Sequence, residues 1–187
     1  MPGFYIAKRG QPPGRAGLQL PFTPTQGPIL LGADTANFLD VPMGPPWSGN
    51  FAALEGIRTS AMTNCMVVCV VQAVGNGWGL GYFNHIPGGY WRRDQDWTWM
   101  GFRNAVAAQD CYGVVFSGFQ SGIGGLVDAV ATFVPLANMS VYVTSIHETD
   151  LAVARAGGYF GETRSTGDVS DRSYYGFGRC GPVRRNL

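Results

Sequence analysis

The sequence predicts an α+β fold, with mixed β-sheets layered against helices, from two observations. The first is a valine-rich, almost continuously apolar run from Cys65 to Val74, followed by Gly75-Asn76-Gly77. Such a run is typical of a strand buried on both faces, and glycine and asparagine favour a hairpin turn. The second is that later strand-like and helix-like segments interleave without the even alternation of a doubly wound parallel sheet.

Composition excludes several classes of protein. The chain has 187 residues, of which 45% are apolar and 13% charged, so it is long enough for one domain with a real core. A net charge of +1 gives no reason to expect nucleic-acid binding, and no run reaches the ~18 apolar residues of a membrane span. Four scattered cysteines do not form a disulfide scaffold, and Cys65-x3-Cys69 lacks zinc-knuckle spacing, so we expect no metal.

The first fifty residues differ from the rest of the chain. Residues 1–50 hold nine of the twelve prolines, which prevents long helices. We interpret them as an extended arm packed on a catalytic domain at 51–187, with one short ordered element near residues 29–31. A disordered leader is the alternative for residues 1–20. No apolar segment follows Lys8 and Arg9, so no signal peptide is visible, and export would need a dedicated secretion machine.

The remaining elements are predicted from periodicity and from turn signals. A return strand follows the hairpin turn, and an aromatic-rich loop follows that strand. In chain order, we expect a strand at 78–85, a loop at 87–99, a helix capped by Thr98 and running to about Gln109, a strand at 111–116, a helix from Ile123 that ends before Pro135, a strand at 141–146, one or two helical turns at 151–156, and a strand at 173–177.

A thiol and an imidazole are candidates for a catalytic pair on the hairpin. If Gly75, Asn76 and Gly77 formed a three-residue loop, His85 would face Val67 and share a face with Cys65. The two side chains would then be diagonal neighbours, roughly 7–8 Å apart at the backbone. A two-residue loop would place His85 on the other face. The pairing therefore requires an odd loop or a bulge.

This pair would suit attack on an amide or ester carbonyl. A thiolate is the nucleophile, and a nearby imidazole can accept its proton and later protonate a leaving amine. Backbone amides around Asn64 and Cys65 could stabilise an oxyanion. Thr59 could orient His85, but on a straight strand it would lie about 20 Å from Cys65. We therefore expect residues 60–64 to turn the chain back.

Each candidate has a structural alternative. Cys65 could be a small buried hydrophobe, as we expect for Cys69, and His85 could be a surface residue. Cys111 with His147 is a rival pair, although no pattern links them. The aromatic group of Trp91, Trp97 and Trp99 could form a substrate rim, with Trp91 and Trp97 at its edge, or could cover the core.

The order Thr59-x5-Cys65, an apolar strand, and His85-Ile86-Pro87 resembles the bacterial protein-glutamine deamidases. That superfamily includes CheD, the cytotoxic necrotizing factor catalytic domains and the Burkholderia lethal factor. The similarity continues to about residue 147, through Phe116-Ser117-Gly118 and the helix around Leu126. It implies a β-sandwich of mixed sheets flanked by helices, with Cys65 as nucleophile, His85 as base and acid, Thr59 as its positioning residue, and no cofactor.

The resemblance also implies a function. It suggests a protein-glutamine deamidase that converts a glutamine of another protein to glutamate, with ammonia released from a cysteine thioester. Thr63-Asn64 before Cys65, together with the unmatched residues 1–50, favours a toxin-like bacterial effector. We would expect a monomer that leaves the bacterial cytoplasm for the medium or the host cytosol and acts on a host regulatory or translation factor.

Two other functions stay open. The same pair would serve a transglutaminase or a cysteine protease, which differ in the acceptor or in the bond broken. A non-catalytic protein-binding domain could instead keep the fold and use Trp91 and Trp97 as docking anchors. Replacement of Cys65 separates these hypotheses, because it should abolish the activity of an enzyme and leave that of a binding domain unchanged.

Overall fold

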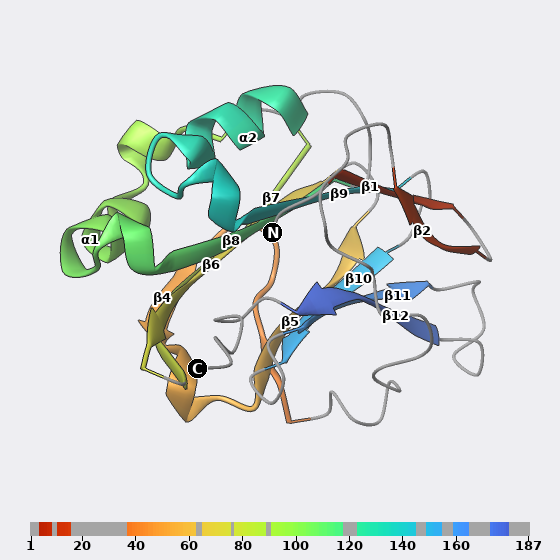
Figure 1. The fold of residues 1–187 in the computed structure, drawn as a ribbon, viewed down its shortest axis with the longest axis horizontal. Helices are drawn as coiled ribbons and strands as arrows, with labels where there is room; N and C mark the ends of the chain where they lie inside the picture. The colour runs from red at the N-terminus through yellow and green to blue at the C-terminus, as the bar shows by residue number, and fades with distance from the viewer. Residues whose placement is uncertain are drawn as a thin grey trace.

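In the part of the chain that the structure describes, two sheets and two helices form three layers (Figure 1). The computed structural model of the chain describes residues 4–8, 11–15, 37–62, 65–75, 77–88, 91–117, 123–144, 149–154, 159–164 and 173–179. Within these residues the α+β class with mixed sheets is confirmed. The short element expected near residues 29–31 lies outside them.

The larger sheet has seven strands and carries the hairpin. Two of its pairings, β1 with β9 and β8 with β9, are parallel, and the others are antiparallel. In spatial order its strands are β2 (Gln11–Arg15), β1 (Phe4–Lys8), β9 (Met139–Thr144), β8 (Cys111–Ser117), β6 (Met66–Val74), β7 (Gly77–Ile86) and β4 (Trp47–Asn50).

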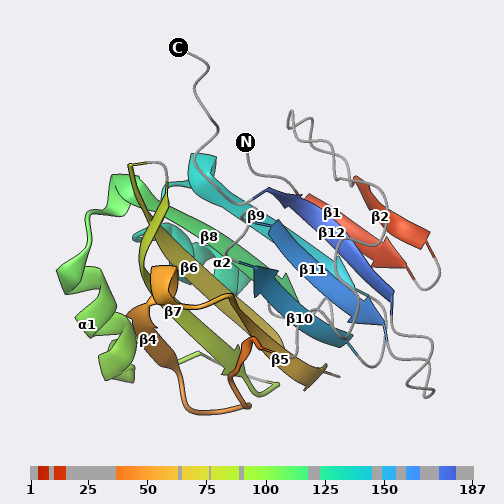
Figure 2. The ribbon, with the colours of Figure 1, turned by 90° about the horizontal axis from the view of Figure 1, so that it is seen from below.

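The smaller sheet has five strands and lies against one face of the larger one (Figure 2). Its pairings are antiparallel except for that of the two-residue strand β3 with β5. In spatial order the strands are β12 (Ser173–Arg179), β11 (Tyr159–Arg164), β10 (Thr149–Ala154), β5 (Gly56–Met62) and β3 (Leu39–Asp40).

Strand β10 corrects one prediction. The helical turns expected at 151–156 are wrong, because residues 149–154 form a strand. That strand pairs with β5 on one side and β11 on the other, and Val153 is buried between the sheets. Pairing on both edges outweighs the helical preference of its alanines.

The core between the sheets is built on alternate residues of β6. Cys65, Val67, Cys69 and Val71 all belong to it, because successive side chains of a strand point to opposite faces. Other members come from β5, β7, β8 and β10, from the 3₁₀ turn η2 (Phe51–Ala53) and from the segment after β3: Val41, Phe51, Ile57, Met62, Phe83, Val114 and Val153. The two sheets are therefore joined by one apolar layer.

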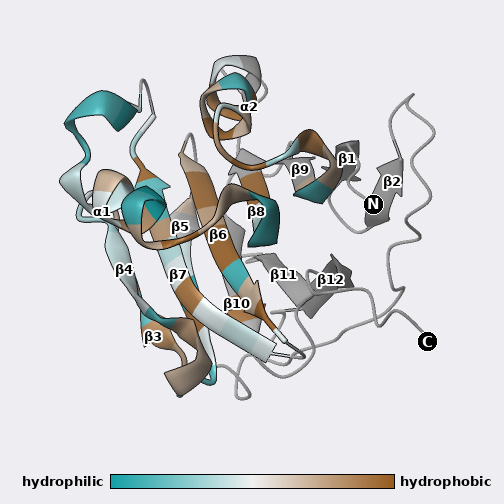
Figure 3. Cartoon of the chain, turned by 60° about the vertical axis from the view of Figure 1, so that its left-hand side comes forward, coloured by the Kyte–Doolittle hydropathy of each residue, from teal (hydrophilic) through white to brown (hydrophobic). Residues whose placement is uncertain are grey.

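The opposite face of the larger sheet is covered by the two helices. Met66, Val68 and Val70 of β6 pack there against Trp99 of α1 (Trp97–Ala105) and Val130 of α2 (Ile123–Ala131). Figure 3 shows β6 coloured as hydrophobic over most of its length, as expected for a strand buried on both faces. Three further 3₁₀ turns lie in the described residues: η3 (Arg93–Gln95), η4 (Ala108–Asp110) and η5 (Leu136–Asn138).

The start of α1 differs from the prediction. Asp96, not Thr98, caps the helix, and its Oδ1 accepts a hydrogen bond from the amide of Trp99 at 2.8 Å. The helix also ends at Ala105 rather than near Gln109. The other carboxylate oxygen of Asp96 accepts hydrogen bonds from the Tyr82 hydroxyl at 2.5 Å and the Trp91 indole at 3.2 Å, which ties the loop before the helix to β7.

The described parts of residues 1–50 are built into both sheets. Strands β1, β2 and β4 belong to the larger sheet and β3 to the smaller one. The main chain between β3 and β4 therefore crosses from the edge of one sheet to the edge of the other. The described parts of this segment therefore supply edge strands to both sheets.

Candidate active site

His85 faces Val67, which places it on the inter-sheet face of the larger sheet. The pairs run from Met66↔Ile86 through Val67↔His85 to Val71↔Gly81. Cys65 lies two residues before Val67 and packs in the same inter-sheet core. The expected register is confirmed, and Cys65 and His85 are diagonal neighbours across the β6–β7 ladder.

A bulge, rather than a three-residue loop, produces this register. At the turn Val74 pairs with Gly77, which leaves two residues in the loop and would on its own bring His85 opposite Met66. Between Val71 and Ala73 the pairing shifts, so that two residues of β7 stand opposite Gln72. The extra residue returns His85 to the face that holds Cys65.

Side-chain contacts of Gln72 match this bulge. Its Oε1 accepts a hydrogen bond from the amide of Leu80 at 3.3 Å, a group that the shifted ladder leaves unpaired. A Cβ at position 79 would lie 2.5 Å from the same oxygen and 2.7 Å from Cγ2 of Val74, so a side chain there would force both neighbours to shift. Gly79 inside a strand was the signal in the sequence that a bulge was present.

Thr59 reaches His85 from the opposite sheet. Ile57 and Thr59 of β5 both point into the inter-sheet core, and Thr59 is only 1% exposed. Its hydroxyl lies 2.7 Å from Nδ1 of His85, a hydrogen bond between two buried side chains. The structure therefore brings Thr59 and His85 together, although they are 26 residues apart in the chain.

The main chain between Thr59 and Cys65 does not follow the expected path, in which residues 60–64 turn the chain back. Residues 60–62 do not turn back, because they continue strand β5 to Met62. The chain then passes to the other sheet and begins β6 at Met66. Residues 63 and 64 lie outside the described part, and with them the proposed role of Asn64 at an oxyanion site.

The imidazole of His85 is buried, and among the described residues only one of its two nitrogens has a hydrogen-bond partner. The residue is 2% exposed, and burial lowers the pKa of His85 below its ordinary value. The ring is therefore neutral near pH 7 and carries one proton. Nε2 has no hydrogen-bond partner among the described residues. If Nδ1–H donates to Thr59, Nε2 keeps a free lone pair that can accept a proton.

The Cys65 thiol lies next to a methionine. Cys65 is 7% exposed, and its Sγ is 3.8 Å from Sδ of Met43, a residue of the segment between β3 and β4. Within the described residues no hydrogen bond joins Cys65 to His85. The next residue of that segment, Gly44, donates its amide to the carbonyl of His85 at 3.0 Å. Sequence patterns gave no signal for either contact.

The other described cysteines behave as core residues. Cys69 is fully buried between the sheets, and burial raises its pKa far above the ordinary range. Cys111 lies on the helix side of the larger sheet, where burial and then the charge of Asp110 raise the pKa of Cys111 to about 12. Its expected partner in the rival pair, His147, lies outside the described residues. Cys111 therefore lacks the environment of an activated nucleophile.

The tryptophans do not surround the Cys–His pair. Trp99 is buried in the helix-side core, and Trp91 is 9% exposed against the same core. Trp97, at the start of α1, is 80% exposed. Trp91 and Trp99 therefore cover the core, whereas Trp97 points to solvent.

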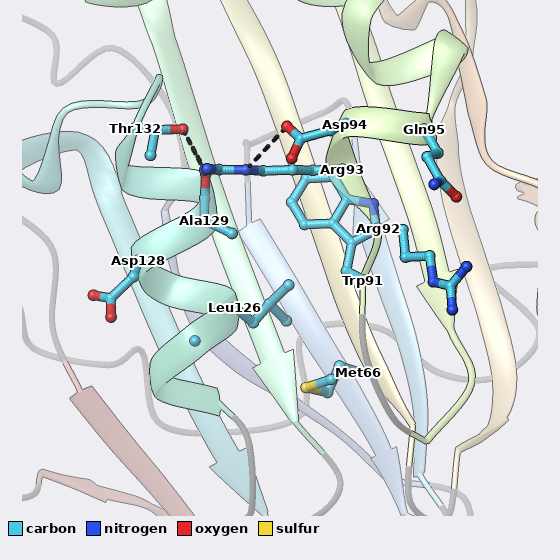
Figure 4. Close-up of a pocket in the computed structure, with 11 residues that line it drawn as sticks. Met66, Trp91, Arg92, Arg93, Asp94, Gln95, Leu126, Asp128, Ala129 and Thr132 are labelled. Atoms are coloured by element: carbon cyan, nitrogen blue, oxygen red, sulfur yellow. Dashed lines mark hydrogen bonds and ion pairs between the residues drawn. The ribbon is translucent and has the colours of Figure 1, made fainter.

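A hollow of about 730 Å³ lies on the helix side of the larger sheet (Figure 4). Trp91, Met66 and Leu126 supply apolar lining, and Arg93 crosses to the end of α2, where it donates to Thr132 and to the carbonyl of Ala129. Met66 points away from the face that holds Cys65. The hollow is thus separated from the Cys–His pair by the sheet itself.

No group of three or more histidine, cysteine, aspartate or glutamate side chains gathers within the described ranges. In that part of the chain neither helix has the length and apolar character needed to cross a membrane. The buried Thr59–His85–Cys65 arrangement remains the strongest candidate site.

Comparison with protein-family models and with curated proteins finds no match to this chain. The resemblance to glutamine deamidases therefore rests on the sequence motif of Thr59, Cys65 and His85 alone.

Proposed function

We propose that the chain is a protein-glutamine deamidase with Cys65 as nucleophile, His85 as base and acid, and Thr59 as the residue that positions His85. The observation that carries the proposal is the buried hydrogen bond between the Thr59 hydroxyl and Nδ1 of His85, while Nε2 has no partner among the described residues. A neutral histidine fixed at one nitrogen and free at the other is suited to proton transfer.

The proposed reaction has two stages. Cys65 Sγ attacks the side-chain amide carbon of glutamine while His85 Nε2 takes the thiol proton. His85 then passes that proton to the departing nitrogen, which leaves as ammonia, and a thioester remains. Water deprotonated by His85 attacks the thioester, and glutamate and the free thiol of Cys65 are released. The side-chain amide thus becomes a carboxylate, and no metal or organic cofactor takes part.

The substrate class follows from the resemblance and from the chemistry. We infer a toxin-like bacterial effector that acts, as a monomer, on a glutamine of another protein, such as a host regulatory or translation factor. The change replaces a neutral hydrogen-bonding group with a negative charge, which is costly wherever that group is buried in a functional site. Such an effector would work in the host cytosol after export.

The experiment compares cells that produce the wild-type chain with cells that produce Cys65→Ser. Mass spectrometry of the cellular proteins should find glutamate at positions encoded as glutamine only with the wild type. Amine adducts at glutamine would indicate a transglutaminase, and new chain termini a protease. If both versions cause the same cellular effect and neither alters any glutamine, the chain is a binding domain and the proposal fails.

A further inference from the structure

The segment between β3 and β4 passes over the candidate site. We define residues 41–46 as the strap. At one end Val41 donates its amide to the carbonyl of Arg58 in β5 at 2.9 Å, and at the other end Trp47 of β4 pairs with Phe83 of β7. The strap therefore bridges the edge strands of the two sheets, next to the strands that carry Thr59 and His85.

Two residues of the strap touch the site directly. Gly44 donates its amide to the carbonyl of His85, which holds the middle of the strap against the end of β7. Gly44 has φ of +109°, a conformation that disfavours any residue with a side chain. Met43 then lies beside the thiol of Cys65, sulfur to sulfur at 3.8 Å.

Exposure indicates which side of the thiol Met43 covers. Met43 is 54% exposed, whereas Cys65 is 7% exposed and His85 2% exposed. Met43 is thus a solvent-facing side chain in contact with the thiol. A reactant that approaches from solvent on this side meets the methionine before it meets Cys65.

We propose that Met43 is a specificity-determining residue of the Cys65 centre. It narrows the approach to the thiol, so that a slender, unbranched side chain ending in a primary amide enters and a main-chain peptide bond, flanked by two residues, does not. Methionine suits this position because its unbranched side chain can move aside for a thin group. The inference rests on the proposed function, and it explains why the site would deamidate glutamine rather than cleave chains.

The test uses two thiol reagents of different shape. Iodoacetamide is thin and carries a primary amide, whereas N-phenylmaleimide is broad. The rate at which each reagent modifies Cys65 in the folded chain is measured by peptide mass spectrometry. The iodoacetamide rate is divided by the N-phenylmaleimide rate, and this ratio is then divided by the same ratio measured for the thiol of glutathione. For the wild type we expect this ratio to favour iodoacetamide by roughly tenfold or more.

Three variants separate the role of Met43 from general effects. Met43→Ala should bring the ratio to within about twofold of glutathione, because it removes the cover. Met43→Leu, of similar volume, should keep the wild-type preference. Leu136→Ala also truncates an exposed apolar side chain, which is 62% exposed in η5, and should change nothing. Circular dichroism confirms that each variant is folded.

The outcomes distinguish this inference from the proposed function. A Met43→Ala ratio equal to that of the wild type, or a Cys65 that reacts with neither reagent in any variant, overturns the role of Met43 even if deamidation is found. A lost preference in Met43→Ala supports the role even if no glutamine is altered in cells, since no protein substrate is needed. If glutamine is altered, Met43→Ala should in addition produce new chain termini.

Discussion

Replacing Thr59 by valine tests the hydrogen bond on which the candidate site depends. The two side chains have nearly the same shape, so the change removes the hydroxyl and little else. Thr59 and His85 are 1% and 2% exposed, so water cannot replace the lost partner of Nδ1. An unpaired buried polar group costs about 1–3 kcal/mol, and the added valine methyl offsets part of it.

We therefore expect Thr59→Val to lower the free energy of unfolding by about 1–2 kcal/mol. For a chain of this size that corresponds to a fall in Tm of about 2–8 °C. Loss of the fixed ring orientation should also slow alkylation of Cys65 by iodoacetamide near neutral pH, roughly tenfold to a hundredfold.

The matched control is Thr59→Ser, which keeps the hydroxyl and loses a methyl group. It should be destabilised by a similar amount, about 1 kcal/mol, because a small cavity forms. Its alkylation rate should nevertheless stay close to that of the wild type. If Thr59→Val and Thr59→Ser react at the same rate as the wild type, Thr59 is a packing residue and does not position His85.

The remaining predictions concern the same sheet and the helix beside it. Since His85 has a lowered pKa in the folded chain, the unfolded chain binds more protons near pH 6.5, so the free energy of unfolding should fall as pH drops through about 6.5. Urea titrations should show this dependence reduced in His85→Gln, and an unchanged pH slope would contradict the buried neutral ring. Gly79→Ala should destabilise by about 1–3 kcal/mol, because its Cβ would lie 2.7 Å from Cγ2 of Val74 and would displace the Gln72 oxygen that bonds the Leu80 amide. Gly101→Ala, in α1 with open space around it, should instead stabilise by up to about 1 kcal/mol in thermal melts. Asp96→Ala should lower the free energy of unfolding by about 2–4 kcal/mol, because it removes a helix cap and leaves buried donors unpaired. Thr98→Ala should lower it by under about 0.5 kcal/mol, and equal losses in the two variants would contradict the assignment of Asp96 as the cap.

Strong local signals predicted the centre of the larger sheet well. The valine-rich run at 65–74 and the glycines at 75–77 lead directly to β6, the turn and β7. The side-chain period of two then links Cys65, Val67 and His85 to one face once the register is known. These features depend on neighbours in the sequence, and for that reason they can be predicted from it.

Features set by distant contacts were not predicted. The helical turns expected at 151–156 became a strand because β5 and β11 pair with both of its edges. The contact of Thr59 with His85 was expected, but its origin was not: Thr59 belongs to a strand of the opposite sheet, which no local pattern indicates. The contact of Met43 with Cys65 joins residues 22 apart across the strap. In each case the deciding contacts lie far away along the chain.

The bulge in β7 has a consequence for how this strand tolerates changes in length. Two residues, Gly79 and Leu80, stand opposite one residue of β6, so the strand holds one residue more than a regular ladder needs. Deletion of Leu80 would make the ladder regular and still leave His85 opposite Val67. A residue inserted between Gly81 and His85 would shift the pairing by one position, and the imidazole would then point toward the helices. Homologous chains that are one residue shorter here could therefore keep the same pair of side chains, whereas longer ones would need a second bulge.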